Sequence, residues 1–136
     1  MMKANGTFTV KKWEEETYKE VSPEMKMTKA SVEYAFEGEA DGIASVEYLM
    51  FYKYFDPSDQ HKSSAIFVGL FKFSGNLSGK EGIFFMEENG IFENGAVSST
   101  FKIINGSGLG DLKQISGTGH YLANQDGSRF EFDYNL

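Results

Sequence analysis

Cysteine is absent from this chain of 136 residues, and histidine occurs only twice. Without cysteine the protein has no disulfide framework, thiolate nucleophile or cysteine-based zinc or iron–sulfur site. Two histidines with no recognisable spacing match no metal-site pattern, so we expect neither a metal ion nor another cofactor. The lack of cysteine also fits a reducing compartment, and we expect the protein to be cytoplasmic.

Long apolar runs and a basic surface are missing as well. The N-terminus turns polar at Lys3, which argues against a secretory signal, and no segment reaches the roughly 20 apolar residues of a membrane-spanning helix. The 20 acidic residues outnumber the 13 basic ones and give a net charge of −7, which repels phosphate backbones. These features predict a soluble protein that binds neither membranes nor nucleic acid.

The composition instead favours β-structure. The chain has 15 glycines, 13 phenylalanines and seven tyrosines, against two prolines and one tryptophan. Five dipeptides typical of tight hairpin turns divide it at short intervals. They are Asp41-Gly42, Asn89-Gly90, Asn94-Gly95, Asn105-Gly106 and Asp126-Gly127.

Eight segments have the length of strands, and most alternate apolar and polar residues with a period of two. They are residues 7–13, 30–36, 43–55, 65–73, 83–88, 96–104, 112–122 and 129–136. Short turns between consecutive strands indicate an up-and-down order, and about eight strands can close without free edges. We therefore predict an all-β protein with one domain, residues 1–136, folded as a single closed antiparallel up-and-down β-barrel of about eight strands. Residues 13–29 would also suit a short helix, but extended or irregular structure is favoured.

Aromatic residues are the first candidates for a binding site. A barrel of this size either fills with side chains or admits one small ligand. Tyr48, Tyr52 and Phe101 are among the aromatics that could line such a pocket, although core packing accounts for the same residues. We expect Trp13 to close one barrel end, with its indole N–H paired to the backbone.

Carboxylates and one histidine are the polar candidates. Glu33 and Glu47 have apolar neighbours, and an inward orientation would raise the pKa of either through desolvation, as a general acid or base requires. The alternative is an outward glutamate paired with a strand lysine. The adjacent Glu87 and Glu88 point to opposite faces, so they form no dyad without a partner from another strand. His120, also in a strand, is a second polar candidate.

The chain also resembles a known family over nearly its whole length. The residues that carry the resemblance are Gly6–Val10 with Trp13-Glu14, Val46–Met50, Phe67–Leu70, Phe84–Gly90, Gly106–Leu112 and Asp133-Tyr134. They resemble the bacterial domain of unknown function 3224 family, whose fold is similar to allene oxide cyclase-like and calycin-type barrels. The resemblance implies a β-barrel with a central cavity and the capacity to form oligomers, but no activity. Family members often carry histidine where this chain has Glu88, which weakens any site built on a histidine there.

Three functional hypotheses follow. The leading one is a barrel that binds a small apolar or amphipathic ligand, with Glu47 or His120 as its polar anchor. The second is a cofactor-free cyclase or isomerase in which Glu47 or Glu33 acts as general acid or base. The third is a structural or interaction module that forms homo-oligomers through the outer face of residues 43–55, because both faces of that strand are partly apolar.

Overall fold

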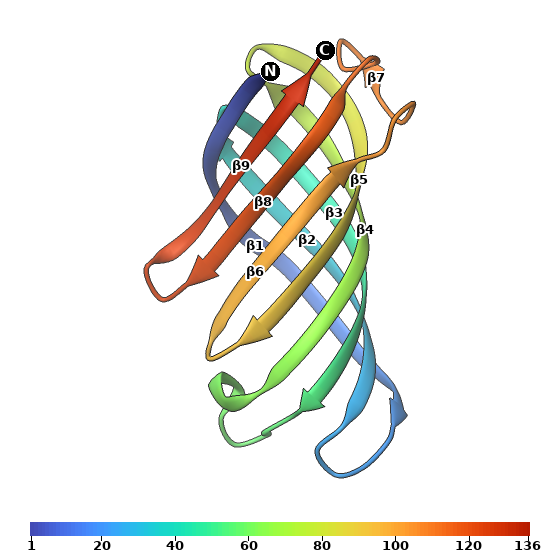
Figure 1. The fold of residues 1–136 in the computed structure, drawn as a ribbon, viewed down its shortest axis with the longest axis vertical. Helices are drawn as coiled ribbons and strands as arrows, with labels where there is room; N and C mark the ends of the chain where they lie inside the picture. Colours follow the sequence, from blue (N-terminus) through green and yellow to red (C-terminus); the bar gives the residue numbers. More distant parts are fainter.

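The computed structural model describes residues 1–136 and consists of one antiparallel sheet of nine strands (Figure 1). The elements, in chain order, are β1 (Met2–Glu20), β2 (Lys26–Gly38), β3 (Ala40–Tyr54), the 3-10 helix η1 (Gln60–Lys62), β4 (Ser64–Leu77), β5 (Lys80–Glu93), β6 (Ala96–Ile103), β7 (Leu109–Gly110), β8 (Ser116–Asn124) and β9 (Gly127–Asn135). No helix has the length and hydropathy needed to cross a bilayer.

Eight of the strands form a ring. The sheet order runs β4-β3-β2-β1-β9-β8-β6-β5, and pairing between β4 and β5 joins its two ends. The two-residue β7 adds to β5 outside this ring. The prediction of an all-β, closed, antiparallel up-and-down sheet of about eight strands is confirmed. The extended structure favoured after Trp13 is also confirmed, because β1 continues to Glu20.

Three local predictions were wrong. The segment predicted as a strand from Leu112 begins its strand only at Ser116, because Leu112 and Ile115 are buried within a turn. Asn89-Gly90 lies inside β5 rather than in a turn. Gly90 is needed there because the ring of Phe67 covers its backbone, where a Cβ would collide with the ring. Asp41-Gly42 likewise lies within β3, whereas the other three dipeptides do form turns.

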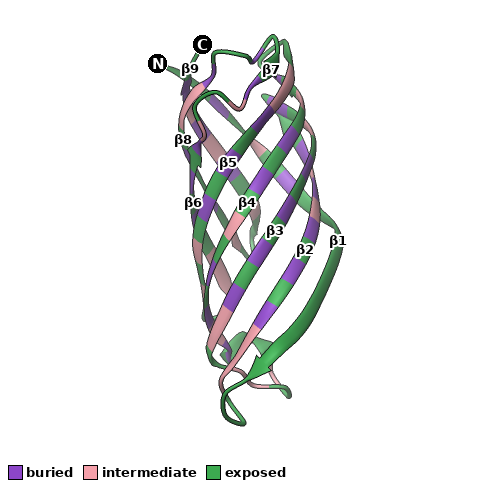
Figure 2. Cartoon of the chain, turned by 90° about the vertical axis from the view of Figure 1, so that its right-hand side faces the viewer, coloured by how far each residue is buried: buried purple, intermediate pink, exposed green.

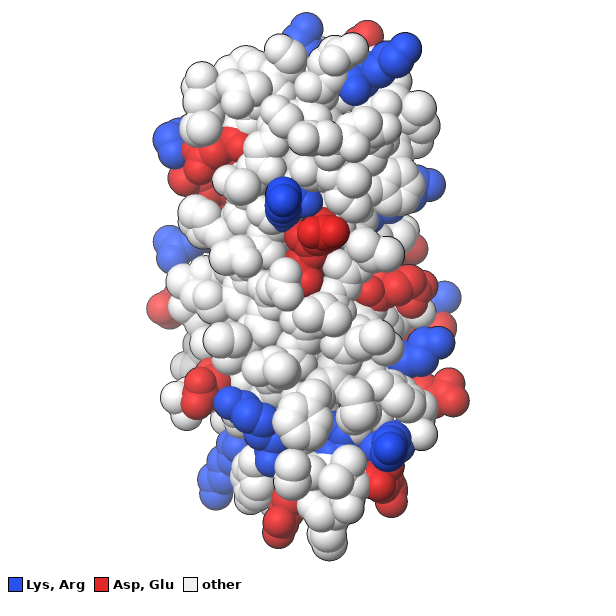
Figure 3. All heavy atoms as spheres, turned by 45° about the vertical axis from the view of Figure 1, so that its right-hand side comes forward, with Lys and Arg blue, Asp and Glu red and all other residues white.

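Buried and exposed residues alternate along the strands of the ring (Figure 2). In β3, Ala44, Val46, Tyr48 and Met50 are buried and the residues between them are exposed, which is the period-two pattern of a strand with one buried face. The face seen in Figure 3 carries interspersed acidic and basic side chains between broad uncharged areas.

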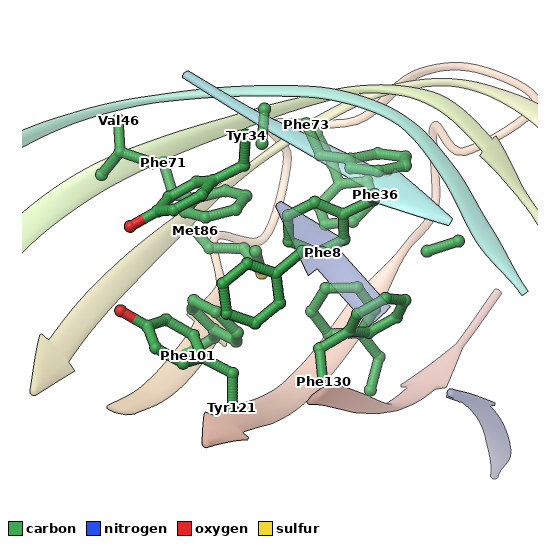
Figure 4. Packing of buried hydrophobic residues seen from close by; sticks show 14 of the residues in the cluster. Phe8, Tyr34, Phe36, Val46, Phe71, Phe73, Met86, Phe101, Tyr121 and Phe130 are labelled. Carbon is green, nitrogen blue, oxygen red and sulfur yellow. The ribbon is translucent and has the colours of Figure 1, made fainter. Parts of the chain in front are cut away.

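The interior at the end that holds both termini is filled by phenylalanine rings (Figures 1 and 4). Phe36 is a central member, with ring centroids 4.7 Å from Phe130, 5.8 Å from Phe71 and 5.8 Å from Phe73. These rings pack as edge-to-face or tilted pairs, the arrangements that aromatic quadrupoles favour. We call this end the closed half.

The opposite end of the barrel is incomplete, because β6, β8 and β9 are shorter than β1 to β5 (Figure 1). β9 pairs with β1 only from Met2 to Thr7, so the rest of β1 has β2 as its sole neighbour in the sheet. The ring therefore opens along β1, and its interior there is not filled. We call this end the open half.

Candidate functional site

The open half contains a cavity of about 700 Å³. Thirteen of its 18 lining residues are hydrophobic, so an occupant would have to be largely apolar. This volume lies within the range of roughly 300–1,000 Å³ that is typical of small-molecule sites. Among the wall residues are Trp13, Tyr52, Phe55, Phe67 and Phe92.

A β-bulge in β1 determines which of its residues face the cavity. Before the bulge the even-numbered Phe8 and Val10 face inward, but the pairing register with β2 shifts between Val10 and Lys12. An extra residue in one strand reverses the inside–outside alternation after it. Trp13 and Glu15 therefore face the cavity although their numbers are odd.

Trp13 forms part of the cavity wall near its open end. Its ring lies over that of Tyr48, with centroids 6.3 Å apart, and 44% of the residue is exposed. The expectation that its indole N–H pairs with the backbone was wrong. The N–H instead donates to the Glu15 carboxylate, at 3.0 Å, because residues two apart in a strand lie on the same face and the bulge turns this face inward.

The inner end of the cavity, which we call the floor, holds a buried carboxylic acid. Glu88 on β5 has no exposed surface, and its Oε1 accepts a hydrogen bond of 2.8 Å from the Tyr48 hydroxyl. The Ser99 hydroxyl lies 2.8 Å from Oε2, and the Tyr34 hydroxyl lies 2.9 Å from that of Tyr48. Tyr34, Tyr48 and Tyr121 line the cavity, and Glu88 lies behind them. These five residues are the floor cluster.

Gly69 makes the Tyr48–Glu88 contact possible. It lies on β4, opposite Tyr48 on one side and opposite Glu88 on the other. A Cβ at this position would be only 2.6 Å from Cδ1 of Tyr48. Because glycine has no side chain, the Tyr48 ring can lie across β4 and reach the carboxyl group of the next strand.

Burial dominates the acid–base properties of the floor cluster. Desolvation raises the pKa of Glu88 to about 7, although hydrogen bonds from Ser99, Tyr48 and Tyr121 favour the carboxylate. Desolvation also raises the pKa of Tyr34 to about 12 and the pKa values of Tyr48 and Tyr121 well above their usual range. Near neutral pH the tyrosines therefore stay protonated while Glu88 titrates.

The hydrogen bonds of the cluster can accommodate both protonation states of Glu88. The single hydroxyl proton of Ser99 has two acceptors in reach, the Glu88 carboxylate and the Asn89 carbonyl oxygen at 3.1 Å. Ionised Glu88 accepts this proton. Protonated Glu88 can donate to the Ser99 oxygen instead, and Ser99 then donates to Asn89. Proton uptake therefore leaves no buried group without a partner.

The outer end of the cavity, which we call the mouth, holds a second carboxylate. Glu15 accepts three hydrogen bonds: from the Trp13 indole at 3.0 Å, the Thr28 hydroxyl at 2.7 Å and the Tyr52 hydroxyl at 2.8 Å. Three neutral donors from β1, β2 and β3 thus fix the position of one carboxylate where the cavity meets solvent.

A lysine lies against aromatic rings at the same place. The Nζ of Lys26 is 3.5 Å from the ring centroid of Phe55 and 5.3 Å from that of Tyr52. The two rings stand nearly perpendicular to each other, with centroids 5.4 Å apart. An ammonium group at this distance is attracted by the negative faces of aromatic rings.

The structure brings some of the sequence candidates together and separates others. Tyr48, Tyr52 and Trp13 line the cavity, and Phe101 is buried in the aromatic core, 5.4 Å from the ring of Tyr121. The hydroxyls of Tyr34 and Tyr121 lie on one side of this core (Figure 4).

Glu33, Glu47 and His120 lie on the outer surface instead. Glu47 is exposed and accepts a hydrogen bond of 2.6 Å from Ser31, and His120 borders a shallow polar groove outside the barrel. The alternation in β3 that buries Val46 and Tyr48 turns Glu47 outward. No group of three or more His, Asp or Glu side chains is arranged to hold a metal ion.

Glu88 was not proposed as a site residue from the sequence, yet a signal for it exists. It continues the series Phe84 and Met86 on one face of β5, and all three are buried. A glutamate is expected to face inward when it lies two residues beyond a buried apolar series, as Glu88 does. Apolar residues directly before and after it in the chain do not give this information. The prediction that Glu87 and Glu88 face opposite sides is confirmed.

Comparison with known proteins found a solved structure with the same fold and a family model that matches the chain. No curated protein matches the chain. A solved structure of a protein of unknown function from the DUF3224 family of Shewanella oneidensis MR-1 superposes with a TM-score of 0.80, at 23% sequence identity, over 100% of this chain and 98% of that one. The family model described as "Protein of unknown function (DUF3224)" matches residues 4–135. With nearly every residue of the chain covered by that model, the protein belongs to the DUF3224 family.

Proposed function

We propose that this chain binds a small, amphipathic and largely apolar molecule in the open half of its barrel. The observation that carries the proposal is the cavity of about 700 Å³, walled by aromatic side chains. Aromatic rings of the closed half meet at centroid distances near 5 Å and fill their space. In the open half the same kinds of residue leave room for an occupant.

The floor cluster supports a polar anchor for such a ligand. When Glu88 is ionised, the hydroxyl protons of Tyr48 and Ser99 point toward its carboxylate. The Tyr48 oxygen then accepts a hydrogen bond from the Tyr34 hydroxyl and has one lone pair left for the cavity side. A hydroxyl or N–H group of a ligand would find an acceptor there, while its apolar body contacts Phe67 and Met50.

A titration with decan-1-ol, an uncharged amphipathic probe, tests the proposal. Trp13 is the only tryptophan and lines the cavity, so its fluorescence reports on binding. We expect a saturable change in the wild type. Val97→Phe, which places a ring in the cavity, should weaken binding by at least about tenfold. Ser98→Phe, on the exposed face of the same strand, is the matched control and should bind normally.

The proposal would be abandoned if decan-1-ol caused no saturable change in the wild type. Equal weakening in Val97→Phe and Ser98→Phe would also contradict it, because only the former changes the cavity. Circular dichroism of all three proteins shows whether each is folded.

A second candidate function, proton transfer without a cofactor, is favoured by one observation. A buried carboxyl with a pKa of about 7 is connected to the cavity through the hydroxyl of Tyr48. A bound molecule with an acidic C–H could give its proton to Tyr48 Oη while the Tyr48 proton passes to Glu88. Return of the proton to another carbon would isomerise the molecule, and all atoms balance.

Deuterium exchange tests this candidate. Molecules extracted from the purified protein are returned to it in D2O, and incorporation of deuterium into their C–H positions is followed by mass spectrometry. The candidate predicts exchange with the wild type and with Glu87→Gln, whose side chain lies outside the barrel, but not with Glu88→Gln. Absence of exchange in the wild type would contradict the candidate.

A further inference from the structure

The mouth of the cavity carries a fixed negative charge. Glu15 and Lys26 are the two charged residues that line the cavity. The Glu15 carboxylate is held by three neutral donors at 2.7–3.0 Å, and it belongs to none of the ion pairs in the structure, which join Lys3 to Glu131 and Asp133 and Lys12 to Glu14. Its position is therefore set in advance, while its charge has no cationic partner in contact.

Beside this carboxylate, an ammonium group already occupies an aromatic site. Lys26 Nζ lies 3.5 Å from the centroid of Phe55 and 5.3 Å from that of Tyr52, and Tyr52 itself donates a hydrogen bond to Glu15. The lysine stem is flexible and begins at the first residue of β2, next to a turn, so its ammonium can move into solvent. The lysine shows what kind of group the two rings favour.

We propose that the mouth recognises an ammonium group, so that the ligand of this barrel is an amphipathic amine. This inference rests on the proposed function. The ammonium of the ligand takes the place of Lys26 Nζ over Phe55 and Tyr52, beside the Glu15 carboxylate. Its apolar body extends along the cavity toward the floor cluster.

The charges around the cavity favour this class over a carboxylate ligand. An anionic head group at the mouth would meet Glu15, with Glu88 behind the floor and a net charge of −7 on the whole chain. Lys26 is the one cation on the cavity wall that could oppose this repulsion. A neutral head group would avoid the repulsion and could donate a hydrogen bond to the carboxylate, but it would gain neither the charge–charge attraction nor the cation–π attraction of the aromatic pair.

Calorimetric titration with three ligands of equal chain length tests the inference. Decylammonium, decan-1-ol and decanoate are titrated at neutral pH, the two ions below the concentration at which they form micelles and decan-1-ol below its solubility limit. We expect decylammonium to bind at least about tenfold more tightly than decan-1-ol, and decanoate to bind most weakly.

Two variants assign the effect to named residues. Glu15→Gln keeps the size of the side chain but removes its charge, and should reduce the preference for decylammonium over decan-1-ol to within about threefold. Lys26→Met removes the internal competitor and should strengthen decylammonium binding. Glu14→Gln is the matched control, because Glu14 is exposed and paired with Lys12, and should change neither affinity.

The results separate the two levels of the proposal. If decan-1-ol binds and decylammonium binds no more tightly, or if decanoate binds best, the ammonium inference is overturned while ligand binding stands. A preference that persists in Glu15→Gln also overturns it. If none of the three ligands binds, the cavity proposal fails together with the inference. Unchanged decan-1-ol affinity in Glu15→Gln shows that the variant is folded.

Discussion

The closed half of the barrel is filled by phenylalanine, whereas the open half surrounds a cavity with tryptophan, tyrosine and phenylalanine. Phe71, Phe73 and Phe132 in the closed half have no exposed surface. Phe92 in the open half is half-buried and borders the cavity. Both halves consist of alternating strands rich in aromatic residues, so composition does not account for the difference.

Strand length accounts for the difference better. β6, β8 and β9 have eight or nine residues, while β1 to β5 have 13 to 19. Eight strands surround the closed half, and fewer surround the open half (Figure 1). Rings can meet across a complete barrel, but where one side of the wall is missing they have no partners to pack against. A cavity with access to solvent is the consequence.

Removing one ring from each half should give the largest contrast. Phe132→Ala leaves a hole among fully packed rings and should lower the free energy of unfolding by about 3–5 kcal/mol. Phe92 borders existing free space, so its ring makes fewer contacts. Phe92→Ala should therefore lower the free energy of unfolding by less than about 1.5 kcal/mol. Urea denaturation at one pH measures both. Equal losses would contradict the division into two halves.

Glu88 lies where the two halves meet, and it should make stability depend on pH. Its pKa is about 7 in the folded protein against an ordinary value of 4.5, so the folded state retains a proton in that interval that the unfolded state releases. The free energy of unfolding should therefore fall as the pH rises from about 4.5 to 7, by about 3 kcal/mol from this group.

Glu88→Gln should remove this part of the pH dependence, because its amide does not titrate. Glu87→Gln, one residue away on the outer face, should keep it. Urea denaturation at several pH values between 4 and 8 provides the measurement. The prediction would be contradicted if the free energy of unfolding changed with pH to the same extent in the wild type and in Glu88→Gln, because the buried carboxyl would then not titrate in this range.

The smallest effect on stability is expected on the outer surface of β3 and β4. Leu49, Val68 and Leu70 lie exposed on these paired strands, with Leu70 62% exposed. The sequence predicts self-association through the outer face of residues 43–55, which includes Leu49, and Val68 and Leu70 extend this apolar surface onto β4. Leu70→Glu should change the free energy of unfolding by no more than about 0.5 kcal/mol, yet weaken association between copies.

Sedimentation velocity over a range of concentrations measures this association. Leu122→Glu on β8, another exposed leucine away from β3 and β4, is the matched control and should associate as the wild type does. A wild type that stays monomeric at high concentration would contradict the predicted interface.

Alternation along the chain was sufficient to predict the ring of strands, because a strand with one buried face repeats every two residues. It was not sufficient for the cavity. The bulge after Val10 reverses the alternation in β1, and no periodic pattern reveals where an extra residue is inserted. Trp13 and Glu15 could be placed at the mouth only from the pairing of β1 with β2.

Contacts between neighbouring strands explain the other differences between the sequence predictions and the structure. Glu47 is flanked by apolar residues along the chain, but its alternation in β3 directs it outward, while Glu88 is brought to Tyr48 across Gly69. Asn89-Gly90 has the composition of a turn, yet the glycine serves to accommodate the Phe67 ring from the neighbouring strand. Each contact depends on strands that are distant in sequence, which local patterns do not encode.

The methyl NMR signals of two methionines test the central claim most directly. Met50 lines the cavity of the open half, and Met86 is fully buried in the closed half. In protein labelled at the methionine methyl groups, titration with decan-1-ol should shift the Met50 signal until saturation and leave the Met86 signal in place. A Met50 signal that does not respond, or one that moves no more than that of Met86, would contradict a ligand site confined to the open half.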